Sequence, residues 1–463
     1  MINDILTVRG RRAHSSPALV SAPPSKSISH RMLVAACLAA GESRLENVLE
    51  SADTRATSEI LTRLGAKIRP EGGDLLVDGL GGRLIHNGKE PLDCYVHESG
   101  TTCRLLTAVL AAGEGNFYVH GSPRMSERPM RALTEMLESL GAEIHFENRT
   151  GYLPFRMTAS GLDRGGKTMR DGGELLVETS QTSQYLSGLL LAAPLGSGLR
   201  LIPTAGAAEA LVSWSYAQLT LQTLRDFGVS FKVESRESLG AEWKQTDWEG
   251  RAGPASGLWR ITVCPGVYRA GEYRVEGDFS NASYLLGAGA AGKRPVRVGN
   301  LNPQSMQGDR EILSILQRMG ASVSIQKDSV EVAPPEGGLK GIEVNMGDCP
   351  DIVPTVAAVA AFAEGPTRIS GVAHLRIKES DRIAAPAAEL RKVGCEVREL
   401  DDGMVVIPPL NLKAPAEPFE TYNDHRMAMS MSILSCAGFD VQIKNPDCVG
   451  KSFPGFWEEW AGI

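Results

Sequence analysis

The sequence predicts a mixed α/β protein built of two similar globular domains. The first reason is length, because 463 residues exceed a single typical domain and imply two sizeable cores. The second is composition, because 42% hydrophobic and 22% charged residues describe a folded chain and not a disordered one. The third is an internal repeat, in which one alternation of helices and strands returns six times.

Each repeat contains a helix rich in alanine and leucine that ends near Gly or Pro, and a short strand follows. Five of the glycines at these helix ends lie 72, 179, 73 and 73 positions apart, and the wide interval holds two repeats: Gly41, Gly113, Gly292, Gly365 and Gly438. A second helix ends at a glycine before an alternating strand, as in "LTRLGAKI" and "LRKVGCEV". Each repeat therefore reads strand, helix, strand, helix, strand. Two halves of three repeats fit better than one doubly wound sheet.

The third repeat contains an additional polar segment at about residues 235–257. The segment holds Gly, Ser and Trp without a clean hydrophobic period. We expect it to be a surface insertion.

Charge and cysteine usage narrow the possible partners and the compartment. A formal charge of -7 argues against a nucleic-acid binder but permits a local basic cleft for a small anion. The eight cysteines are scattered without a metal-ligand spacing, so they are expected to be free thiols in a reducing compartment. The N-terminal arginines and serines faintly resemble a transit peptide, but there is no continuous apolar signal. The longest apolar stretches are too short to span a bilayer, so a soluble cytoplasmic protein is expected.

Basic and hydroxyl side chains gather where the first helix of the chain begins, in "SKSISHRMLVAACL". Ser25 or Ser27 is the expected N-cap, Lys26 stands at the helix start, and Ser27 and Arg31 lie one turn apart. A helix N-terminus with these neighbours favours an anion, although no Walker motif is present. Taken alone, the stretch is better explained by a capping serine beside solvated cations.

The same arrangement recurs at the starts of other repeats, which favours a common anion site. The segment "KESDRIAAPAAEL" places Lys378 and Arg382 one turn apart, with Pro386 expected to kink the helix or delay its start. The other positions are Thr101, Thr102 and Arg104; Thr182, Ser183 and Gln184; Asp424, His425 and Arg426; Arg124 in a Pro-bounded loop; and Lys451.

A set of ordered motifs in the sequence resembles those of a known family. The segments "PPSKSISHR", "ESGTTCR", "PRMSERPM", "VEGDFSNASYLL", "CPDIVPT", "RIKESDR", "TYNDHRMAM" and "GKSFPGF" occur in the order found in the EPSP synthase (3-phosphoshikimate 1-carboxyvinyltransferase) family, from Pro23 to Phe456. The resemblance implies two halves of three repeats joined by a double crossover, an inside-out barrel fold. One domain would span residues 25–275, and the other residues 1–24 plus 276–463.

The resemblance also implies the reaction. Phosphoenolpyruvate gives its enolpyruvyl group to the 5-hydroxyl of shikimate 3-phosphate and phosphate leaves, in chorismate and aromatic amino acid biosynthesis. It implies no metal or organic cofactor, small-molecule substrates only, and a monomer without nucleic-acid or membrane partners. The two substrates carry roughly six negative charges at neutral pH. Seven basic side chains could balance these negative charges: Lys26, Arg31, Arg124, Lys378, Arg382, Arg426 and Lys451.

Binding residues follow by position from the resemblance. Shikimate 3-phosphate is assigned to Lys26, Ser27, Arg31, Thr182, Ser183, Gln184, Ser213, Tyr216, Asp351, His374 and Lys378. Phosphoenolpyruvate is assigned to Lys26, Gly100, Arg124, Gln184, Arg382, Arg426 and Lys451.

The catalytic residues implied are Asp351, Glu379, Lys26 and His425. Asp351 is implied as the base near the attacking hydroxyl, and Glu379 as the group that protonates the methylene carbon, with Lys26 acting beside it. His425 is a hydrogen-bond donor nearby. From the residues alone, Asp351 reads as a helix cap and Glu379 as a partner of neighbouring cations.

Three positions depart from the family pattern. Glu98 stands where many members have Asn, so its carboxylate either pairs with a cation or weakens anion binding. Thr182 replaces a commoner Ser and keeps the hydroxyl. His374 replaces an Asn and is expected to add a contact that is sensitive to pH near neutrality.

Two alternative functions stay open. The enolpyruvyl transferase that acts on UDP-N-acetylglucosamine shares the fold, but its family has Lys-Asn where this chain has Lys26-Ser27, and a loop cysteine where this chain has Arg124. A non-catalytic anion-binding relative would be expected to lose Asp351, Glu379 or Lys26, and all three are present. The family is also the target of glyphosate, and Gly100 leaves room for that inhibitor, so we expect sensitivity.

Overall fold

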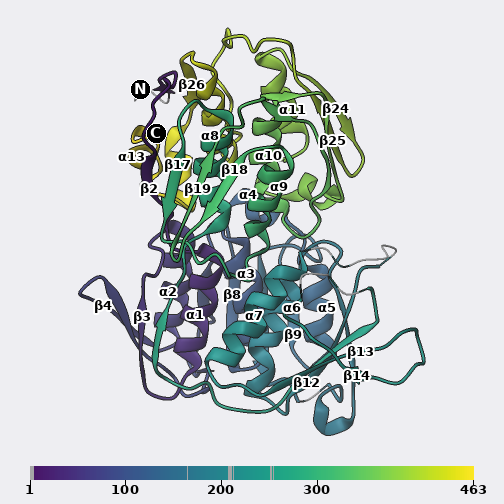
Figure 1. Cartoon of the computed structure of the whole chain (residues 1–463). Helices are drawn as coiled ribbons and strands as arrows, with labels where there is room; N and C mark the ends of the chain where they lie inside the picture. The colour runs from purple at the N-terminus through teal and green to yellow at the C-terminus, as the bar shows by residue number, and fades with distance from the viewer. Residues whose placement is uncertain (1–4, 164, 207–210, 212, 251–252, 254) are drawn as a thin grey trace. The chain divides into compact units, whose positions relative to one another are not determined.

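The computed structural model describes residues 5–163, 165–206, 211, 213–250, 253 and 255–463. The chain divides into two compact units (Figure 1). Unit 1 comprises Met1–Ser25 with Glu276–Ile463, and unit 2 comprises Lys26–Val275. The chain therefore crosses between the units twice, after Ser25 and after Val275. The expected mixed α/β fold in two units is confirmed, and the described strands form no closed barrel.

The described residues of unit 2 form three sheets with a common strand order. In each sheet a first strand pairs parallel with a second, and the third and fourth follow antiparallel. The first sheet is β16 (Glu272–Arg274), β3 (Glu42–Glu46), β5 (Asp74–Asp78) and β4 (Lys67–Glu71). The second is β7 (Leu92–Tyr95), β8 (Glu114–His120), β10 (Phe155–Ser160) and β9 (Glu143–Phe146), with β6 (Ile85–His86) also on β8. The third is β11 (Leu175–Glu178), β12 (Leu199–Thr204), β15 (Trp259–Val263), β13 (Phe231–Ser235) and β14 (Lys244–Gln245).

The helices of unit 2 fill its interior. The first helices of the repeats are α1 (Lys26–Leu38), α3 (Gly100–Ala111) and α6 (Gln184–Ala192), and they are buried on nearly all sides. The second helices are α2 (Ala52–Arg63), α5 (Arg131–Ser139) and α7 (Trp214–Asp226), and short turns are α4 (Pro123–Ser126), η1 (Met169–Asp171) and η2 (Ala193–Leu195). At Gly188 a Cβ would lie 2.8 Å from the Arg104 carbonyl oxygen and 2.9 Å from the Ala108 Cβ. Glycine therefore allows α6 to approach α3 closely.

Unit 1 repeats the same strand order in two sheets. One is β2 (Ala18–Ser21), β17 (Val296–Gly299), β19 (Ser329–Ala333) and β18 (Ser322–Ile325). The other is β21 (Glu343–Asn345), β23 (Thr367–Ser370), β25 (Gly403–Ile407) and β24 (Glu396–Leu400). Two small pairs are β1 (Ile5–Val8) with β26 (Val441–Lys444), and β20 (Leu339–Lys340) with β22 (Ala363–Glu364).

The sixth repeat is shortened. Its strand β26 has a parallel bridge from Phe419 to Ile443, and β1 takes the antiparallel place beside it. The chain then continues into η7 (Pro446–Lys451) and α13 (Phe456–Ala461) where the other repeats form a second helix and a hairpin. The predicted six-fold repeat therefore holds in five complete sheets, and the N-terminal strand completes the sixth.

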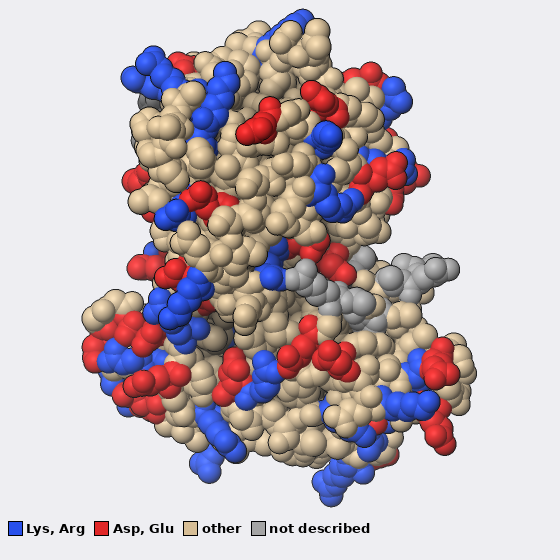
Figure 2. Space-filling view, viewed as in Figure 1, with Lys and Arg blue, Asp and Glu red and all other residues tan. Residues whose placement is uncertain are grey.

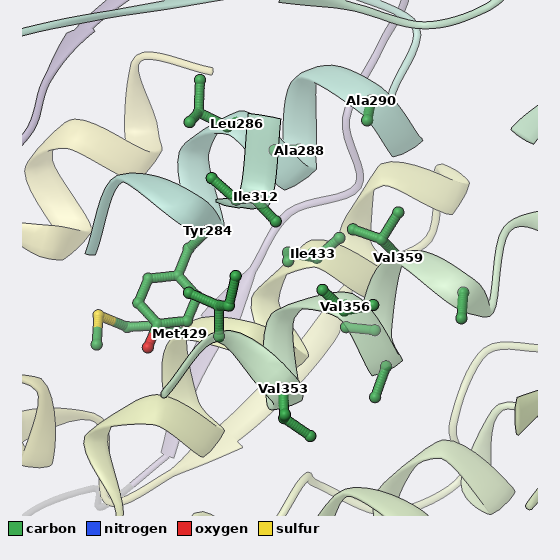
Figure 3. Close-up of a cluster of buried hydrophobic side chains, with 14 of the residues drawn as sticks. Tyr284, Leu286, Ala288, Ala290, Ile312, Val353, Val356, Val359, Met429 and Ile433 are labelled. Carbon is green, nitrogen blue, oxygen red and sulfur yellow. The ribbon is translucent and has the colours of Figure 1, made fainter. Parts of the chain in front are cut away.

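The core of unit 1 lies between helices. Tyr284 from α8 (Phe279–Ala291), Val356 from α10 (Val353–Ala360) and Ile433 from η6 (Ile433–Ala437) belong to one buried cluster (Figure 3). The remaining elements are α9 (Ile312–Arg318), α11 (Ala384–Lys392), α12 (His425–Ser432), η3 (Gly308–Glu311), η4 (Pro350–Ile352) and η5 (Ala373–Ile377). The first helices α8, α10 and α12 are buried almost completely, so only their ends can carry polar chemistry.

The glycines that end the second helices have the expected backbone conformation. Their φ angles are 108°, 107°, 74°, 101° and 95° at Gly65, Gly141, Gly228, Gly320 and Gly394. A left-handed residue after the last turn is the usual glycine stop of a helix. The repeat pattern therefore rests on a conformation that other residues adopt with strain.

The distribution of surface charge and the state of the cysteines are those of an ordinary folded protein. Charges of both signs are interspersed on the face shown in Figure 2. All eight cysteines are free, as expected, and burial raises the pKa of Cys103 to about 11. Among the described residues, no helix is long and apolar enough to cross a membrane. The same part of the chain contains no cluster of three His, Cys, Asp or Glu side chains that could hold a metal ion.

Candidate active-site residues

The predicted residues of unit 2 stand at the beginnings of buried helices. Lys26, Gly100 and Gln184 are the first residues of α1, α3 and α6, and Ser213 immediately precedes α7. Because α1 begins at Lys26, Ser25 is the residue before the helix and Ser27 lies inside it. Helix N-termini supply unpaired backbone N–H groups and positive potential, so these positions suit anions.

Hydrogen bonds tie these helix starts together. The Gln184 side chain accepts from Arg104 Nη1 at 2.9 Å and donates to Thr101 Oγ1 at 3.0 Å, which joins α6 to α3. Thr182 Oγ1 accepts from the Gln184 backbone N–H at 3.2 Å. Thr182 and Ser183 are both buried. The predicted Thr182 and Ser183 thus lie immediately before α6, and Gln184 is its first residue.

Arg31 is bound mainly by protein groups. Its Nε donates to Thr220 Oγ1 at 2.8 Å and its Nη1 to the Ser27 carbonyl at 2.8 Å. Its Nη2 donates to Ser187 Oγ at 3.0 Å and to the Tyr216 carbonyl at 2.9 Å. Four of the five N–H groups therefore have acceptors in the described part of the chain, and one remains for a ligand. Arg31 joins α1, α6 and α7 as well as being a candidate anion contact.

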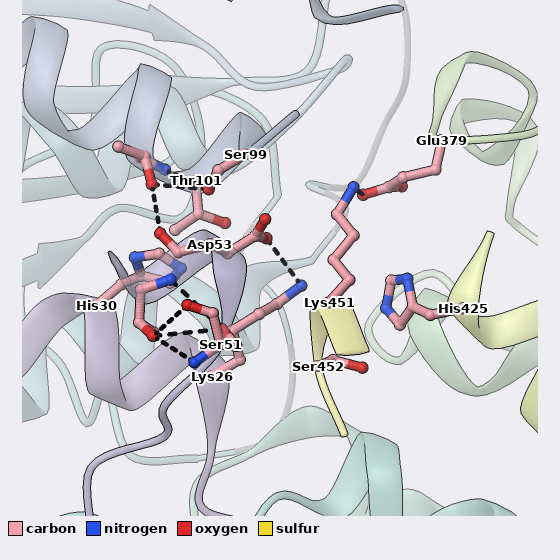
Figure 4. A network of polar contacts seen from close by, with 12 residues as sticks. Lys26, His30, Ser51, Asp53, Ser99, Thr101, Glu379, His425, Lys451 and Ser452 are labelled. Atoms are coloured by element: carbon pink, nitrogen blue, oxygen red, sulfur yellow. Dashed lines mark hydrogen bonds and ion pairs between the residues drawn. The ribbon is translucent and has the colours of Figure 1, made fainter. Parts of the chain in front are cut away.

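Lys26 is paired with a carboxylate that sequence reasoning missed. Its Nζ lies 3.3 Å from Asp53 Oδ2, and both side chains are largely buried (Figure 4). Asp53 stands in the first turn of α2, behind the capping box made by Ser51 and Thr54. The sequence "SADT" signals that helix start, but nothing local in it indicates the pairing with Lys26.

A buried polar chain lies beneath this pair. His30 Nδ1 is 2.8 Å from Thr57 Oγ1, which is 2.8 Å from Thr102 Oγ1. Thr102 in turn donates to Ser99 Oγ at 2.7 Å and to the Asp53 carbonyl at 3.2 Å. Burial lowers the pKa of His30 to about 3, so its ring is neutral. This series of hydrogen bonds fixes the positions of α1, α2 and α3 relative to one another.

Gly100 is enclosed by two guanidinium groups. A Cβ built there would lie 2.5 Å from Arg104 Nη1 and 2.8 Å from Arg128 Nη1. Arg128 was not among the predicted residues, although "PRMSERPM" contains it. The expected open space at Gly100 is thus bounded by cations that a side chain would displace.

Arg124 lies in a short helix, and the expectation of a loop was wrong. Pro123 and the Ser122 cap start α4, where Ser122 Oγ accepts from the Met125 N–H. Arg124 Nη1 is 2.6 Å from Glu127 Oε2, a pair at i,i+3. The side chain is 42% exposed, so an anionic ligand would compete with Glu127 at a wet site.

In unit 1, Arg382 is the most enclosed of the predicted cations. It lies in the segment between η5 and α11, with its side chain 2% exposed. Its guanidinium contacts Asp424 Oδ2 at 2.8 Å, Asp351 Oδ1 at 3.0 Å and Glu379 Oε2 at 3.0 Å. Burial lowers the pKa of Arg382, but the charges of Asp424 and Glu379 outweigh it and raise the pKa above its ordinary value. The start of α11 at Ala384 confirms that Pro386 delays the helix.

The other predicted cations of unit 1 meet the same carboxylates. Arg426 Nη2 lies 2.6 Å from Asp351 Oδ2, and Arg426 Nη1 donates to the Tyr284 hydroxyl at 3.2 Å. Lys451, the last residue of η7, has its Nζ 3.6 Å from Glu379 Oε1 (Figure 4). Lys378 directly follows η5 and is half-buried. His425 begins α12, and its Nδ1 lies 3.6 Å from Asp424 Oδ1.

These pairs correct the simple charge count. The sequence-based balance set seven cations against the substrates without counting protein carboxylates. In the structure Lys26, Arg124, Arg382, Arg426 and Lys451 each contact at least one carboxylate: Asp53, Glu127, Asp351, Glu379 or Asp424. A bound anion must therefore exchange with, or add to, existing ion pairs.

The residue-only interpretations of Asp351 and Glu379 have different outcomes. The N-cap residue of α10 is Ile352, so Asp351 in η4 is not the helix cap. Glu379 is indeed a partner of neighbouring cations, Arg382 and Lys451. This pairing leaves its catalytic role open.

His374 does not behave as expected. It lies buried in η5, and burial, with the nearby Lys378 charge, lowers the pKa of its ring to about 3. The ring is therefore neutral throughout the physiological range. The expectation of a contact that responds to pH near neutrality was therefore wrong, because burial of the ring, which the local sequence does not indicate, disfavours its charged form.

Asp309 is a second buried carboxyl that was not predicted. It belongs to η3, its Oδ2 bonds the Ser280 hydroxyl, and its Oδ1 is buried without a partner in the described residues. Burial, and the charge of Asp351, raise the pKa of Asp309 to about 7. A protonated carboxyl next to Asp351 avoids a like-charge repulsion.

The fold of this chain is similar to those of solved enolpyruvyl transferases. The fold resembles EPSP synthase from Acinetobacter baumannii, with a TM-score of 0.72 and 25% identity over 98% of this chain and 97% of that one. It also resembles the enolpyruvyl transferase NikO from Streptomyces tendae, with a TM-score of 0.69 and 18% identity over 99% and 96%. The two-unit fold is therefore the fold of the enolpyruvyl transferases.

Comparison of the sequence identifies a more specific family than comparison of the fold. A 3-phosphoshikimate 1-carboxyvinyltransferase of Methanoculleus marisnigri is 39% identical over 459 residues, which is 99% of each chain. One of Cupriavidus necator is 38% identical over 450 residues, 96% of each chain. The family model of EPSP synthase (3-phosphoshikimate 1-carboxyvinyltransferase) matches residues 15–246 and 254–460. The chain belongs to the EPSP synthase family.

Proposed function

We propose that this chain transfers the enolpyruvyl group of phosphoenolpyruvate to the 5-hydroxyl of shikimate 3-phosphate and releases phosphate. The observation that carries the proposal is identity of 39% along 99% of a 3-phosphoshikimate 1-carboxyvinyltransferase, with the family match. Retention of Lys26, Asp351 and Glu379 supports an active enzyme over a non-catalytic relative. The alternative acceptor, UDP-N-acetylglucosamine, is not favoured.

The proposed addition step uses the carboxylates of unit 1. Asp351 takes the proton of the 5-hydroxyl while that oxygen bonds to C2 of phosphoenolpyruvate, and Glu379 gives a proton to the methylene carbon. In the elimination step the C2–O bond to phosphate breaks, Glu379 takes a proton back from the methyl carbon, and the proton held by Asp351 leaves with the phosphate. Lys26 acts with Glu379 as proton carrier or electrostatic stabiliser, and His425 donates a hydrogen bond nearby. Protons and the leaving group therefore balance without a further reactant.

The binding roles are proposed on the same basis. Shikimate 3-phosphate is bound by Lys26, Ser27, Arg31, Thr182, Ser183, Gln184, Ser213, Tyr216, Asp351, His374 and Lys378. Phosphoenolpyruvate is bound by Lys26, Gly100, Arg124, Gln184, Arg382, Arg426 and Lys451. The helix-start positions of Lys26, Gly100 and Gln184 support these roles, since backbone N–H groups there add to the cations.

The ion pairs suggest how the carboxylate base becomes available. Arg382 and Arg426 each bond one oxygen of Asp351. A substrate carboxylate that takes these guanidinium groups releases Asp351 from two opposite charges and makes it a stronger base. Phosphoenolpyruvate would thus prepare the base that its own reaction needs.

Two broader features belong to the proposal. The units would act as two domains, residues 25–275 and residues 1–24 plus 276–463, of a monomer that works on small molecules only. The eight free cysteines support a reducing, cytoplasmic setting. Light scattering of the purified protein that gave a dimer mass would contradict the monomer.

The deciding experiment is phosphate release from phosphoenolpyruvate, with shikimate 3-phosphate and UDP-N-acetylglucosamine offered in parallel. We expect release with shikimate 3-phosphate alone, and its loss in Asp351→Ala. Release with UDP-N-acetylglucosamine alone would favour the other transferase. Release with neither acceptor would favour a binding protein.

A further inference from the structure

The polar insertion of unit 2 folds back onto helix α7. Gln218, which is buried in the middle of α7, donates from Nε2 to the Trp248 carbonyl at 2.7 Å and to the Gly250 carbonyl at 2.7 Å. Both N–H groups of this amide are therefore used by backbone of the insertion. Residues 246–250 are called the α7 clamp below.

Side chains of the clamp add further contacts. The Trp248 ring packs edge-on against Phe231, with ring centroids 5.5 Å apart, and the Arg225 guanidinium lies 5.1 Å from the Trp248 centroid. Arg225, in the last turn of α7, also forms an ion pair with Glu249. The clamp therefore contacts α7 at two positions about two turns apart, Gln218 and Arg225, and the sheet at β13.

The clamp is itself held in shape. The Thr246 N–H donates to the Val233 carbonyl at 3.1 Å, and the Glu249 N–H donates to Asp247 Oδ1 at 2.9 Å. The first bond anchors the segment to β13, and the second forms a local Asx turn. A segment fixed at its base can position the helix that it contacts.

Helix α7 carries groups of the candidate site. Ser213 precedes it, and the carbonyl of Tyr216 and the hydroxyl of Thr220 accept from Arg31 at 2.9 and 2.8 Å. Gln218 lies between these two acceptors in the sequence, where the clamp bonds it. A displacement of α7 would therefore move Tyr216 and change two of the bonds that orient Arg31.

The family model does not match the inner residues of the clamp. The family match covers residues 15–246 and 254–460 and omits 247–253, which include Trp248, Glu249 and Gly250. The family-shared part of the chain thus contains α7 and Gln218 but not the carbonyls that Gln218 bonds.

We propose that the α7 clamp sets the affinity for shikimate 3-phosphate, with Gln218 as a positioning residue that acts through Tyr216 and Arg31. This inference rests on the proposed function for the identity of the ligand. It assigns the clamp no contact with either substrate. Its loss should weaken binding of shikimate 3-phosphate and leave the chemical step unchanged.

The first test uses Gln218→Leu in the full chain, because leucine fills the space but donates no hydrogen bond. Gln245→Leu is the matched control, since Gln245 is exposed on β14 of the same insertion. We expect the KM for shikimate 3-phosphate to rise about tenfold in Gln218→Leu, as loss of two hydrogen bonds in a buried site allows. The kcat, the KM for phosphoenolpyruvate and all constants of the control should stay within twofold.

Trp248→Ala provides a second variant that leaves α7 intact, and it should raise the same KM. Unchanged KM values in both variants, or an equal fall of kcat in both, would overturn the proposal.

Hydrogen exchange separates the clamp from the proposed function. In ligand-free protein, amides of α7 should exchange faster in Gln218→Leu than in the wild type or Gln245→Leu. Faster exchange in Gln218→Leu would support the clamp whether or not the enzyme is active. If the wild type released no phosphate with shikimate 3-phosphate, only the proposed function would be defeated. Unchanged exchange along α7 would overturn the clamp.

Discussion

Arg426 donates a hydrogen bond from Nη2 to Asp351 at 2.6 Å in unit 1. A residue predicted to bind phosphoenolpyruvate therefore contacts the residue proposed as the base. Arg382 holds the other oxygen of the same carboxylate at 3.0 Å. The pairing pre-orients Asp351 but also weakens it as a base, because each guanidinium favours its charged form. Under the proposed function, binding of phosphoenolpyruvate to Arg382 and Arg426 would therefore be coupled to activation of Asp351 as the base.

Replacement of Asp351 by Asn should lower kcat by about 10²- to 10⁴-fold, the usual contribution of a general base. The amide keeps the shape of the side chain but cannot accept the hydroxyl proton. Steady-state phosphate release measures the effect, with Glu343→Gln on the exposed face of β21 as control. Retention of more than a tenth of wild-type kcat by a folded Asp351→Asn protein would remove Asp351 from the role of base.

Replacement of Gly100 by Ala should raise the KM for phosphoenolpyruvate by about tenfold or more, as loss of a charged hydrogen bond allows. The new Cβ would require Arg104 and Arg128 to move, and Arg104 holds Gln184. The wild type should be inhibited by glyphosate, and the variant less so. Gly266→Ala is the control, because nothing lies within 4 Å of a Cβ there. An unchanged KM together with unchanged inhibition would place Gly100 away from the phosphoenolpyruvate site.

Asp309 should make stability fall as pH rises. Its pKa is raised from 3.8 to about 7 by burial and by the charge of Asp351, with a further contribution from Asp278 that Arg426 opposes. Between these values the folded state binds the proton more strongly than the unfolded state, so the free energy of unfolding decreases with increasing pH. Asp309→Asn cannot titrate and should lose this decrease.

Urea unfolding of wild type and Asp309→Asn between pH 4 and 7 measures the difference. The stability of the variant relative to the wild type should rise across that window and level off above it. Asp328→Asn, on an exposed turn, controls for the loss of a carboxylate. Parallel curves for wild type and Asp309→Asn would show that Asp309 ionises normally.

Asp424→Asn should be strongly destabilising. Asp424 is fully buried, accepts from Arg382 Nε and Nη2 and from Ser380, and caps α12 through the Arg426 N–H. Removing its charge leaves Arg382 buried without its nearest anion, which costs about 3 kcal/mol or more. Chemical denaturation measures the loss, and Glu399→Gln in the exposed pair with Arg391 should cost less than about 1 kcal/mol. Equal costs for the two variants would contradict the structural role of Asp424.

Local features of the fold could be predicted from the sequence because local residues determine them. Gly65 and Gly394 end helices in the left-handed conformation that glycine tolerates, and Pro386 delays α11 as proline must. The helix starts at Lys26 and Gly100 were visible from their hydroxyl and basic neighbours. Such signals extend over a few residues and do not depend on the rest of the chain.

Relations between distant segments were beyond this kind of prediction. Asp53 pairs with Lys26 across 27 positions, and Asp424 pairs with Arg382 across 42. Arg124 looked like a loop residue because its prolines mark turns as readily as the first turn of a helix. The buried states of His374 and Asp309 arise from packing of other elements around them, so the sequence around them carries no sign of their altered pKa values.

The double crossing of the chain sets an order for folding during synthesis. All residues of unit 2 have been made once residue 275 is added, whereas β1 at Ile5 must wait for its partner Lys444. Because chains are made at about 5–20 residues per second, the N-terminal strand spends tens of seconds without its neighbour. Its unpaired edge is then open to wrong partners, so a nascent chain should engage chaperones through residues 5–21 until the last repeat emerges from the ribosome.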